Sequence, residues 1–520
     1  MKKNVLTHAV IAGIVGVAGV GSIADAVNLN PDGLGQVLIY PYYTTQGGND
    51  TLFTVVNTAD VGKAVKVRFL EGRNSREVLD FHLYLSPHDV WTGAVVASGA
   101  GAGVVTFDNS CTVPDIRRGG LGFEDYGRLQ PFGDSYIANF VNWAYTGSLA
   151  DDTRNAQGQP TPDLDGLDRT REGYIEVIEM GNLAPGGDPH SWALHDSSGE
   201  PGDCDALNEE WFISGNNWSS GNTSWGLLAP DGSGQLFGNA MIVNPARGTV
   251  NGYAADAIEG FNHFVIHDEP GSTEPGLDAV NDPGDDLQAT AYVFASGTLV
   301  TATFDDVPAR GKVDAITALY MSPRVINEFY VEETGPVNFA SEWVINFPTK
   351  RYYVDVNPAL DFGNLFVPVV RAPFVDRFNA AGSCQEVRIT MYDREEQTVT
   401  AAGGGFSPRP PGPDADSLCW EAQVITFNQG DRFTNEEPSD ILGSTYFKNV
   451  TTGYDNGWAH VNFMGSPALR ASAEGVVFNG LPVTGFFATN ADNSNMDDGV
   501  LANYSALFRH RTERSIDILS

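Results

Sequence analysis

Residues 65–85 read Val65-Lys66-Val67-Arg68-Phe69-Leu70, a turn at Gly72-Arg73-Asn74-Ser75, and then Val78-Leu79-Asp80-Phe81-His82-Leu83-Tyr84-Leu85. Apolar and polar side chains alternate along both runs, and this period of two is that of a β-strand with one face against a core. The Gly-Arg-Asn-Ser sequence between them is typical of a tight turn. The stretch therefore predicts two antiparallel strands joined as a hairpin.

The same pattern recurs along the rest of the chain. Its 58 glycines and 29 prolines suit short strands and turns better than long helices. The predicted fold class is all-β, with tandem antiparallel β-sandwich (Ig-like) domains and long acidic Gly/Pro-rich loops. Further strands are expected at 89–96, 104–107, 289–294, 299–304, 343–347, 387–392, 422–427, 459–463, 475–478 and 483–488.

One segment has the composition of a domain linker. Residues 268–287 begin Asp-Glu-Pro-Gly-Ser-Thr-Glu-Pro-Gly and contain few apolar side chains. The length of the chain allows two or three domains. We therefore expect an N-terminal sandwich over 27–267, an acidic linker over 268–287 and a C-terminal sandwich over 288–520.

The N-terminus has the three parts of a secretory signal peptide. Lys2 and Lys3 provide positive charge, residues 5–23 are uncharged, and Ala24-Asp25-Ala26 offers the small residues of a cleavage site. A transmembrane anchor is the alternative, but the stretch is glycine-rich and barely long enough to span. We expect a signal peptide at 1–26, no membrane span later in the chain, and a secreted protein of the cell surface or periplasm.

The cysteines are consistent with an oxidising compartment. There are four, Cys111, Cys204, Cys384 and Cys419, and four cysteines allow three connectivities. Joining the cysteines that are nearest in sequence gives Cys111–Cys204 and Cys384–Cys419, with one bridge in each half. Metal binding is the alternative, but the Cys-x-x-Cys spacing of zinc sites is absent.

The charge balance excludes one class of partner. Acidic residues outnumber basic ones by 66 to 30, which gives a net charge of −36. Such a surface repels the phosphates of nucleic acids, so no nucleic-acid partner is expected. Because 42% of the residues are hydrophobic, the chain can bury a sizeable core and is not a disordered acidic tail.

Four segments of the sequence resemble a known family. They are Gly35-Gln36-Val37-Leu38-Ile39-Tyr40-Pro41-Tyr42-Tyr43-Thr44, the run from Val67 to Phe81, Leu83-Tyr84-Leu85-Ser86-Pro87, and Gly499-Val500-Leu501-Ala502-Asn503-Tyr504-Ser505-Ala506-Leu507-Phe508-Arg509-His510-Arg511. Together they are similar to secreted proteobacterial proteins that are described only as cell surface proteins. The resemblance implies a location at the cell surface and brings no catalytic or binding residues.

Three tryptophans are candidates for sugar binding. Trp211, Trp218 and Trp225 lie in a segment rich in Asn, Ser and Gly. Indole faces beside amides and hydroxyls suit stacking on sugar rings while their hydroxyls are hydrogen-bonded. The alternative is that these tryptophans are packing anchors that hold a Gly-rich loop onto a sheet.

Two acidic loops are candidates for Ca²⁺, although neither has the offsets of an EF-hand, and solvated turns are the alternative. The candidate calcium ligands are Asp163, Asp165 and Asp168 in the first loop and Asp492 and Asp497 in the second.

Two histidines are a separate candidate for metal binding. His263 and His267 lie four residues apart, a spacing that can place both imidazoles on one face of a strand or helix.

No catalytic motif was found. The Gly-x-Ser-x-Gly elbow, the His-Glu-x-x-His helix and the P-loop are all absent. The sequence therefore favours a non-enzymatic structural or adhesive protein of the cell surface or exterior, acting through self-association or cell-surface glycans. The alternative is a secreted carbohydrate-binding or carbohydrate-active protein.

Overall fold

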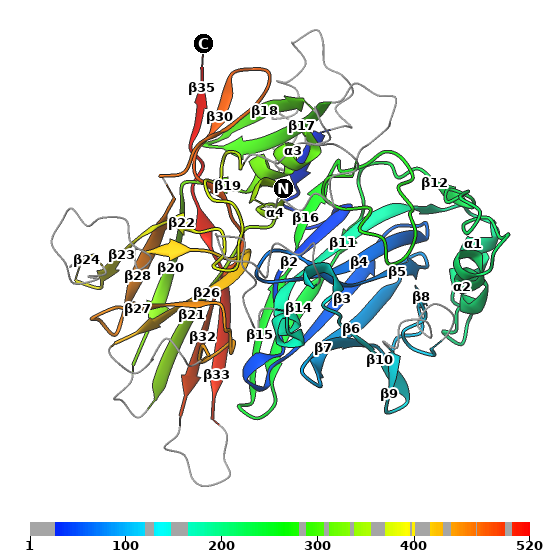
Figure 1. Cartoon of the computed structure of the whole chain (residues 1–520), viewed down its shortest axis with the longest axis horizontal. Coiled ribbons are helices and arrows are strands. Elements are labelled where there is room, and N and C mark those ends of the chain that lie inside the picture. The colour runs from blue at the N-terminus through cyan, green and yellow to red at the C-terminus, as the bar shows by residue number, and fades with distance from the viewer. Residues whose placement is uncertain are drawn as a thin grey trace, which may run out of the picture.

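Antiparallel strands build most of the structure, which confirms the predicted all-β, sandwich-like fold. It is a computed structural model of the chain. It describes residues 26–119, 129–146, 165–279, 288–305, 311–332, 337–354, 370–395, 398–400, 416–429, 438–463, 465–493 and 502–519. Two sandwiches lie side by side (Figure 1).

The first sandwich has two large sheets. The larger has the order β18 (Thr298–Asp305), β17 (Gln288–Ala295), β1 (Ala26–Leu29), β16 (Asp256–Glu259), β2 (Val37–Thr44), β11 (Glu172–Leu183), β4 (Lys63–Glu71), β5 (Glu77–Leu85) and β8 (Cys111–Val113), and β12 (Leu227–Leu228) pairs with β11. The smaller has the order β15 (Thr249–Ala254), β14 (Asn239–Asn244), β3 (Asp50–Asn57), β6 (Val90–Ser98), β7 (Gly101–Val105), β10 (Ser135–Asn139) and β9 (Leu129–Phe132), and β13 (Leu236–Phe237) pairs with β3.

The second sandwich has two five-stranded sheets. The outer sheet has the order β24 (Thr398–Thr400), β23 (Arg388–Asp393), β28 (Asn456–Asn462), β20 (Arg324–Tyr330) and β34 (Arg511–Thr512). The inner sheet has the order β27 (Phe447–Thr451), β26 (Ala422–Asn428), β21 (Asn338–Asn346), β32 (Phe486–Asp492) and β33 (Tyr504–Arg509). Val325, Phe329, Trp343 and Ile345 belong to the core between them.

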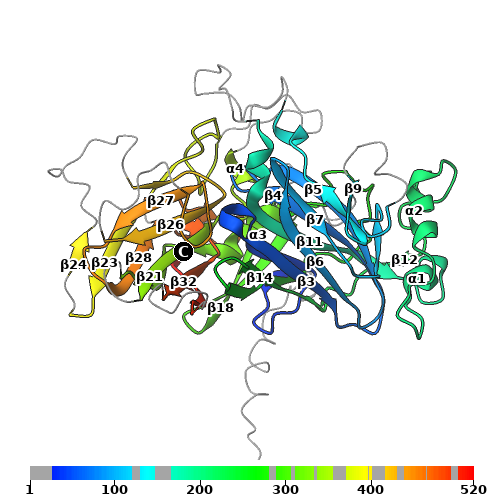
Figure 2. The same cartoon turned by 90° about the horizontal axis from the view of Figure 1, so that it is seen from below.

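Short elements complete the described fold. The remaining strands are β19 (Met321–Ser322) with β31 (Leu481–Pro482), β22 (Gln385–Glu386) with β25 (Ser417–Leu418), and β29 (Leu469–Arg470), β30 (Val476–Phe478) and β35 (Ile516–Ile518). The helices are α1 (Asp188–Ala193), α2 (Cys204–Phe212), α3 (Gly311–Tyr320) and α4 (Arg351–Val354). Helices α1 and α2 lie at the end of the first sandwich that is farthest from the second (Figure 2).

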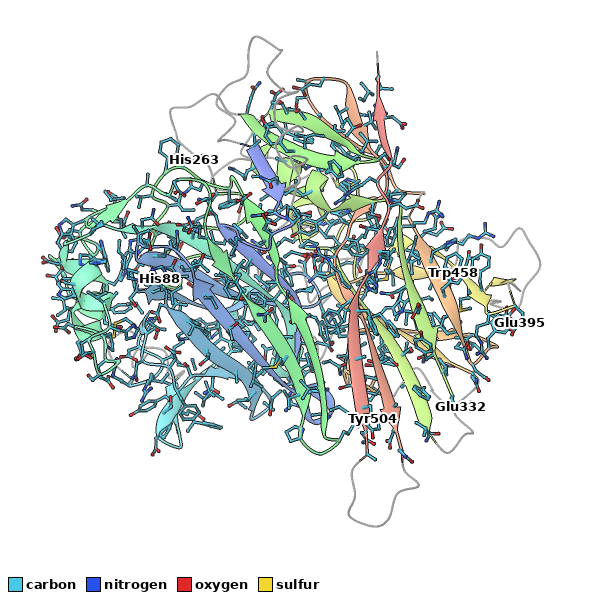
Figure 3. All side chains as sticks on the ribbon, turned by 180° about the vertical axis from the view of Figure 1, so that it is seen from behind. His88, His263, Glu332, Glu395, Trp458 and Tyr504 are labelled. Atoms are coloured by element: carbon cyan, nitrogen blue, oxygen red, sulfur yellow. A yellow bond between two sulfur atoms is a disulfide. The ribbon has the colours of Figure 1, made fainter. Side chains whose placement is uncertain are left out.

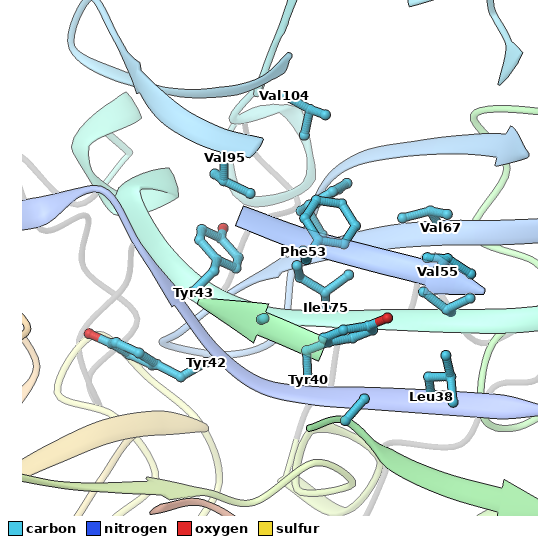
Figure 4. Packing of buried hydrophobic residues seen from close by; sticks show 14 of the residues in the cluster. Leu38, Tyr40, Tyr42, Tyr43, Phe53, Val55, Val67, Val95, Val104 and Ile175 are labelled. Carbon is cyan, nitrogen blue, oxygen red and sulfur yellow. The ribbon is translucent and has the colours of Figure 1, made fainter. Parts of the chain in front are cut away.

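The hairpin at residues 65–85 forms as predicted, and its apolar face builds the first core. Val65, Val67 and Phe69 on β4 are fully buried between the two large sheets. Aromatic rings fill much of this core, among them those of Tyr40, Tyr43 and Phe53 (Figure 4). The rings of Phe53 and Trp91 lie 5.2 Å apart at their centroids. The alternation therefore identified the core face of this strand.

The polar face of the same hairpin is also buried. Lys66 and Arg68 have 0% exposed side chains and are neutralised by carboxylates on neighbouring strands. Lys66 Nζ lies 3.3 Å from Asp80, and Arg68 contacts Glu77 at 2.6 Å and Glu176 at 3.0 Å. Buried charges persist only when they are paired in this way.

The segment that was expected to be a linker helps to cover this polar face. Lys66 Nζ donates hydrogen bonds to the carbonyl oxygens of Ser272 and Glu274. The backbone N–H of Gly271 donates to Asp80 over 2.8 Å. The described part of this segment, 268–279, is therefore packed on the first sheet. Its composition indicated a loop but not that the loop would cover a charged sheet face.

The expected boundary between the domains also differs from the structure. Strand β17 pairs in parallel with β1 and antiparallel with β18, so residues 288–305 extend the larger sheet of the first sandwich. The second sandwich begins at β20. The short N-terminal strand offers an open edge to β17, and this long-range pairing has no local sequence signal. The two sandwiches also share one core cluster, to which the second contributes Val344, Ala422, Val424, Ile441, Leu442, Phe486 and Ala488.

The turn between β4 and β5 inserts into the second half of the chain. Arg73 donates to the carbonyl oxygen of Ala380 over 2.6 Å, and its guanidinium lies 4.5 Å from the ring centroid of Trp420. The backbone N–H of Ala422 donates to the carbonyl oxygen of Gly72 over 2.9 Å. A polar turn that the sequence placed at a hairpin tip thus joins the two halves.

Candidate functional site

The three tryptophans singled out in the sequence form a packed layer over strand β5. Trp211, on α2, is 7% exposed and Trp218 is 1% exposed, whereas Trp225 is half-buried. Trp218 stacks on Tyr84 with ring centroids 5.7 Å apart and an angle of 5° between the planes. Nε1 of Trp218 donates to the carbonyl oxygen of Trp225. The buried faces of Trp211 and Trp218 are not open to a sugar, and the packing alternative describes them.

A chain of hydrogen bonds runs through this layer. Nε1 of Trp211 donates to Tyr84 Oη over 3.1 Å, and Tyr84 Oη lies 2.9 Å from Nε2 of His267. Nδ1 of His267 lies 2.8 Å from the carbonyl oxygen of Thr223, which can only accept, so Nδ1 carries the proton. Nε2 therefore accepts from the Tyr84 hydroxyl. Both ring nitrogens are occupied, so His267 does not offer a metal ligand beside His263.

Buried histidines give a prediction for the pH dependence of stability. Burial lowers the pKa of His82 well below its usual value, that of His267 to about 4 and that of His510 to about 3. In the unfolded chain histidine titrates near a pKa of about 6.5, so the unfolded state binds more protons below that pH. The histidine contribution to the free energy of unfolding is complete above about pH 6.5 and is lost as pH falls toward 4. Urea unfolding at stepped pH measures it.

A variant separates this effect from the titration of carboxylates. His267→Gln removes one buried imidazole and is expected to lose less stability than the wild type between pH 6.5 and pH 4. His88→Gln is the matched control, because His88 is exposed and pairs with Asp60, which is also exposed. Equal pH dependence in wild type and His267→Gln would contradict the explanation.

Both expected disulfides are present. Cys111 on β8 is bonded to Cys204, the first residue of α2, and Cys384 is bonded to Cys419. The first bond attaches the helix that carries Trp211 to the edge of the larger sheet. The pairing of cysteines nearest in sequence is therefore confirmed.

The described residues do not assemble the expected calcium sites. Asp165, Asp168 and Asp492 are exposed. Asp163 and Asp497 lie outside the residues that the structure describes. Within the described ranges, no group of three or more His, Cys, Asp or Glu side chains is placed to hold a metal ion.

Among the helices of the described ranges, none has the length and apolar character needed to cross a bilayer.

Strand β28 has a face that the sequence analysis did not single out. Ala459 and Val461 point into the core of the second sandwich, so the alternation of the strand places Trp458, His460 and Asn462 on the opposite face. The outer sheet turns this face away from the first sandwich, and Figure 3 shows Trp458 on that outer side. The candidate site is built on this face.

Three cross-strand rows define the site. On each row, β28 lies between a residue of β23 and a residue of β20. The aromatic row is Tyr392–Trp458–Glu328, the middle row is Thr390–His460–Ile326, and the arginine row is Arg388–Asn462–Arg324. Successive rows are about 6.7 Å apart along the strands, because each is separated by two residues.

The aromatic row contains an exposed ring stack. The rings of Tyr392 and Trp458 lie 4.4 Å apart at their centroids with 13° between their planes. Trp458 is 40% exposed. His460 lies 5.9 Å from Trp458 and 6.1 Å from Tyr392 at the ring centroids. A cross-strand aromatic pair stabilises a sheet in any case, but here part of the indole also remains open to solvent.

Charged groups lie on the same face as the stack. Glu328 is exposed and accepts a hydrogen bond from the Tyr330 hydroxyl over 2.5 Å, and this bond is the main cause that raises the pKa of Tyr330 to about 12. Arg388 is exposed at the other end of the face. Apolar ring surface beside a carboxylate and an imidazole, with a guanidinium farther along the face, can hold a ligand that has both C–H faces and a polar rim.

The signal for this site was present in the sequence. In Trp458-Ala459-His460-Val461-Asn462-Phe463 the aromatic residue lies on the polar side of the alternation. An aromatic residue on the solvent side of a strand is more informative than three tryptophans close together in sequence, because the latter can all pack inward.

Comparison of the chain with protein-family models, with curated proteins and with solved structures finds no match.

Proposed function

We propose that this chain is an exported, non-enzymatic adhesive protein that binds carbohydrate at the outer sheet of its second sandwich. The observation that carries the proposal is the stack of Trp458 on Tyr392, which is exposed among polar side chains on a sheet face that points away from the rest of the molecule. The signal-like N-terminus, the two disulfides and the resemblance to cell surface proteins support export.

The chemistry of the face suits sugars. A pyranose ring has C–H groups on its faces, which pack on an indole, and hydroxyls at its rim, which hydrogen-bond to carboxylates and imidazoles. Glu328 is the cross-strand partner of Trp458 on β20, and His460 follows Trp458 by two residues on β28. Because the rows are held by backbone ladders on both sides of β28, these groups are positioned before a ligand arrives.

The shape of the molecule is consistent with an adhesive role. The two sandwiches share a core cluster and the inserted turn at residues 72–73, so they present the outer sheet as part of one body. Binding on a preorganised surface costs less conformational entropy than binding on a mobile one.

The proposal predicts that Trp458→Ala loses binding to polysaccharide. Truncating a central aromatic anchor is expected to weaken binding about 30-fold or more. Retention on immobilised dextran, xylan, cellulose and an acidic glycan, measured by affinity electrophoresis, checks it. Trp143→Ala is the matched control, because Trp143 is 52% exposed and lies in the first half of the chain.

Two results would contradict the proposal. One is failure of the wild-type protein to be retained by any of these polysaccharides. The other is equal retention of Trp458→Ala and the wild type. Ordered assembly of the protein without glycan, detected by light scattering, would instead favour a structural role through self-association.

A further inference from the structure

We infer that the sugar held on this face carries a carboxylate, and that the arginine row binds it. The inference rests on the proposed carbohydrate binding and names the class of glycan. The occupant is an acidic glycan in which a uronic acid alternates with a neutral sugar.

The arginine row lies at a fixed distance from the aromatic row. Asn462 follows Trp458 by four residues on β28, so the two rows are about 13 Å apart along the strand. Arg388 and Arg324 are the register partners of Asn462 on the two neighbouring strands. A chain of sugars that follows β28 from the stack therefore reaches two guanidinium groups.

Arg388 is a cation of this face that is available to a ligand. Its side chain is exposed, and among the described residues it has no ion-pair partner within 4.0 Å. Arg324, in contrast, is held by Glu513 at 2.8 Å. Guanidinium binds carboxylate by two parallel hydrogen bonds, and an external carboxylate would complete the pair.

A second observation places both arginines over the same part of the face. Burial first, and then the positive charges of Arg324 and Arg388, lower the pKa of His460, while Glu513 acts against them. The imidazole of the middle row thus lies in the field of both guanidinium groups. Because Glu513 pairs with Arg324, Arg388 is the guanidinium of this row that no described carboxylate neutralises.

The opposite end of the face explains why the sugar at the stack is a neutral one. Glu328 lies beside Trp458 in the aromatic row. This carboxylate repels an acidic sugar at the stack but accepts hydrogen bonds from neutral sugar hydroxyls. A fully acidic polymer would meet repulsion at one end, whereas an alternating glycan has complementary charge at both.

The experiment compares two probes that differ only in charge. A hyaluronan tetrasaccharide alternates glucuronate with N-acetylglucosamine, and its methyl-esterified form has the same sugars without the negative charge. Titration calorimetry on the full chain is expected to show about 10-fold or tighter binding of the acid form, the size expected for a hydrogen bond to a charged group. Arg388→Gln is expected to remove this difference, and Arg388→Lys to restore only part of it.

Arg470→Gln is the control, because Arg470 is exposed on β29 and lies outside the three rows. Equal affinity for acid and ester in the wild type would overturn the inference and leave the proposed function in place, provided that Trp458→Ala still abolishes binding. The inference would also be overturned, and the proposed function kept, if neither probe bound while a neutral polysaccharide retained the protein in a Trp458-dependent way. Failure of Arg388→Gln to change the preference would overturn the role of the arginine row.

Discussion

Removing the Cys111–Cys204 disulfide by Cys111→Ala and Cys204→Ala together is expected to lower the free energy of unfolding by about 4–5 kcal/mol. The bond closes a loop between residues 93 apart in sequence. When the bond is removed, the unfolded chain gains conformational entropy, and this gain grows with the length of the loop. The bond also attaches α2, with Trp211, to the edge of the larger sheet. Urea unfolding followed by tryptophan fluorescence measures the change.

The second disulfide provides the matched comparison. Cys384 and Cys419 are separated by 35 residues, so removing this bond by the corresponding alanine pair is expected to cost about 3–4 kcal/mol. If the shorter loop proved the more stabilising, the explanation from loop entropy would be wrong. Reduction of the wild type should lower stability by more than either pair of substitutions.

Glu71→Gln is expected to cost about 3–5 kcal/mol, because it leaves a buried arginine without its counter-charge. The Glu71 carboxylate holds Arg169 by two hydrogen bonds of 2.7 Å each. It also accepts from the backbone N–H groups of Arg73, Asn74 and Arg76 at 2.8–3.0 Å. The carboxylate therefore shapes the turn that joins the two sandwiches. Urea unfolding and small-angle scattering would report the loss of stability and any separation of the halves.

Two further variants test the cause. Asp60→Asn breaks an ion pair to His88 that is exposed to solvent, and it is expected to have no measurable effect. Adding Arg169→Leu to Glu71→Gln removes the uncompensated charge and is expected to recover part of the lost stability. If the losses of stability from Glu71→Gln and Arg169→Leu simply added in the double variant, the uncompensated charge of Arg169 would not be the cause.

Local patterns were sufficient for the hairpin that opens the first core, although they did not indicate the long central strand β11. The hairpin at 65–85 forms as predicted because a period of two in hydrophobicity reports directly on which side of a strand faces a core. The disulfides also followed from the order of the cysteines along the chain. Both features depend on neighbours in sequence or on the choice among three pairings.

The candidate site was not found in advance, and the reason is geometric. Trp458 and Tyr392 come from strands that are far apart in sequence, and only the pairing of β23 with β28 brings their rings together. Trp211 and Trp218, which are close in sequence, instead turn inward onto Tyr84. Proximity in sequence says nothing about the direction in which a loop side chain points.

What could be learned from the amino-acid order alone was the all-β class, the core face of the strands and the pairing of the cysteines, because these follow from local periodicity and spacing. The folded molecule added the burial of Lys66 and Arg68 beneath residues 268–279, the membership of residues 288–305 in the first sheet, and the meeting of Trp458 with Tyr392. Each of these depends on contacts between distant segments. Such contacts are selected by the burial and charge pairing of the whole chain, and no short stretch encodes them.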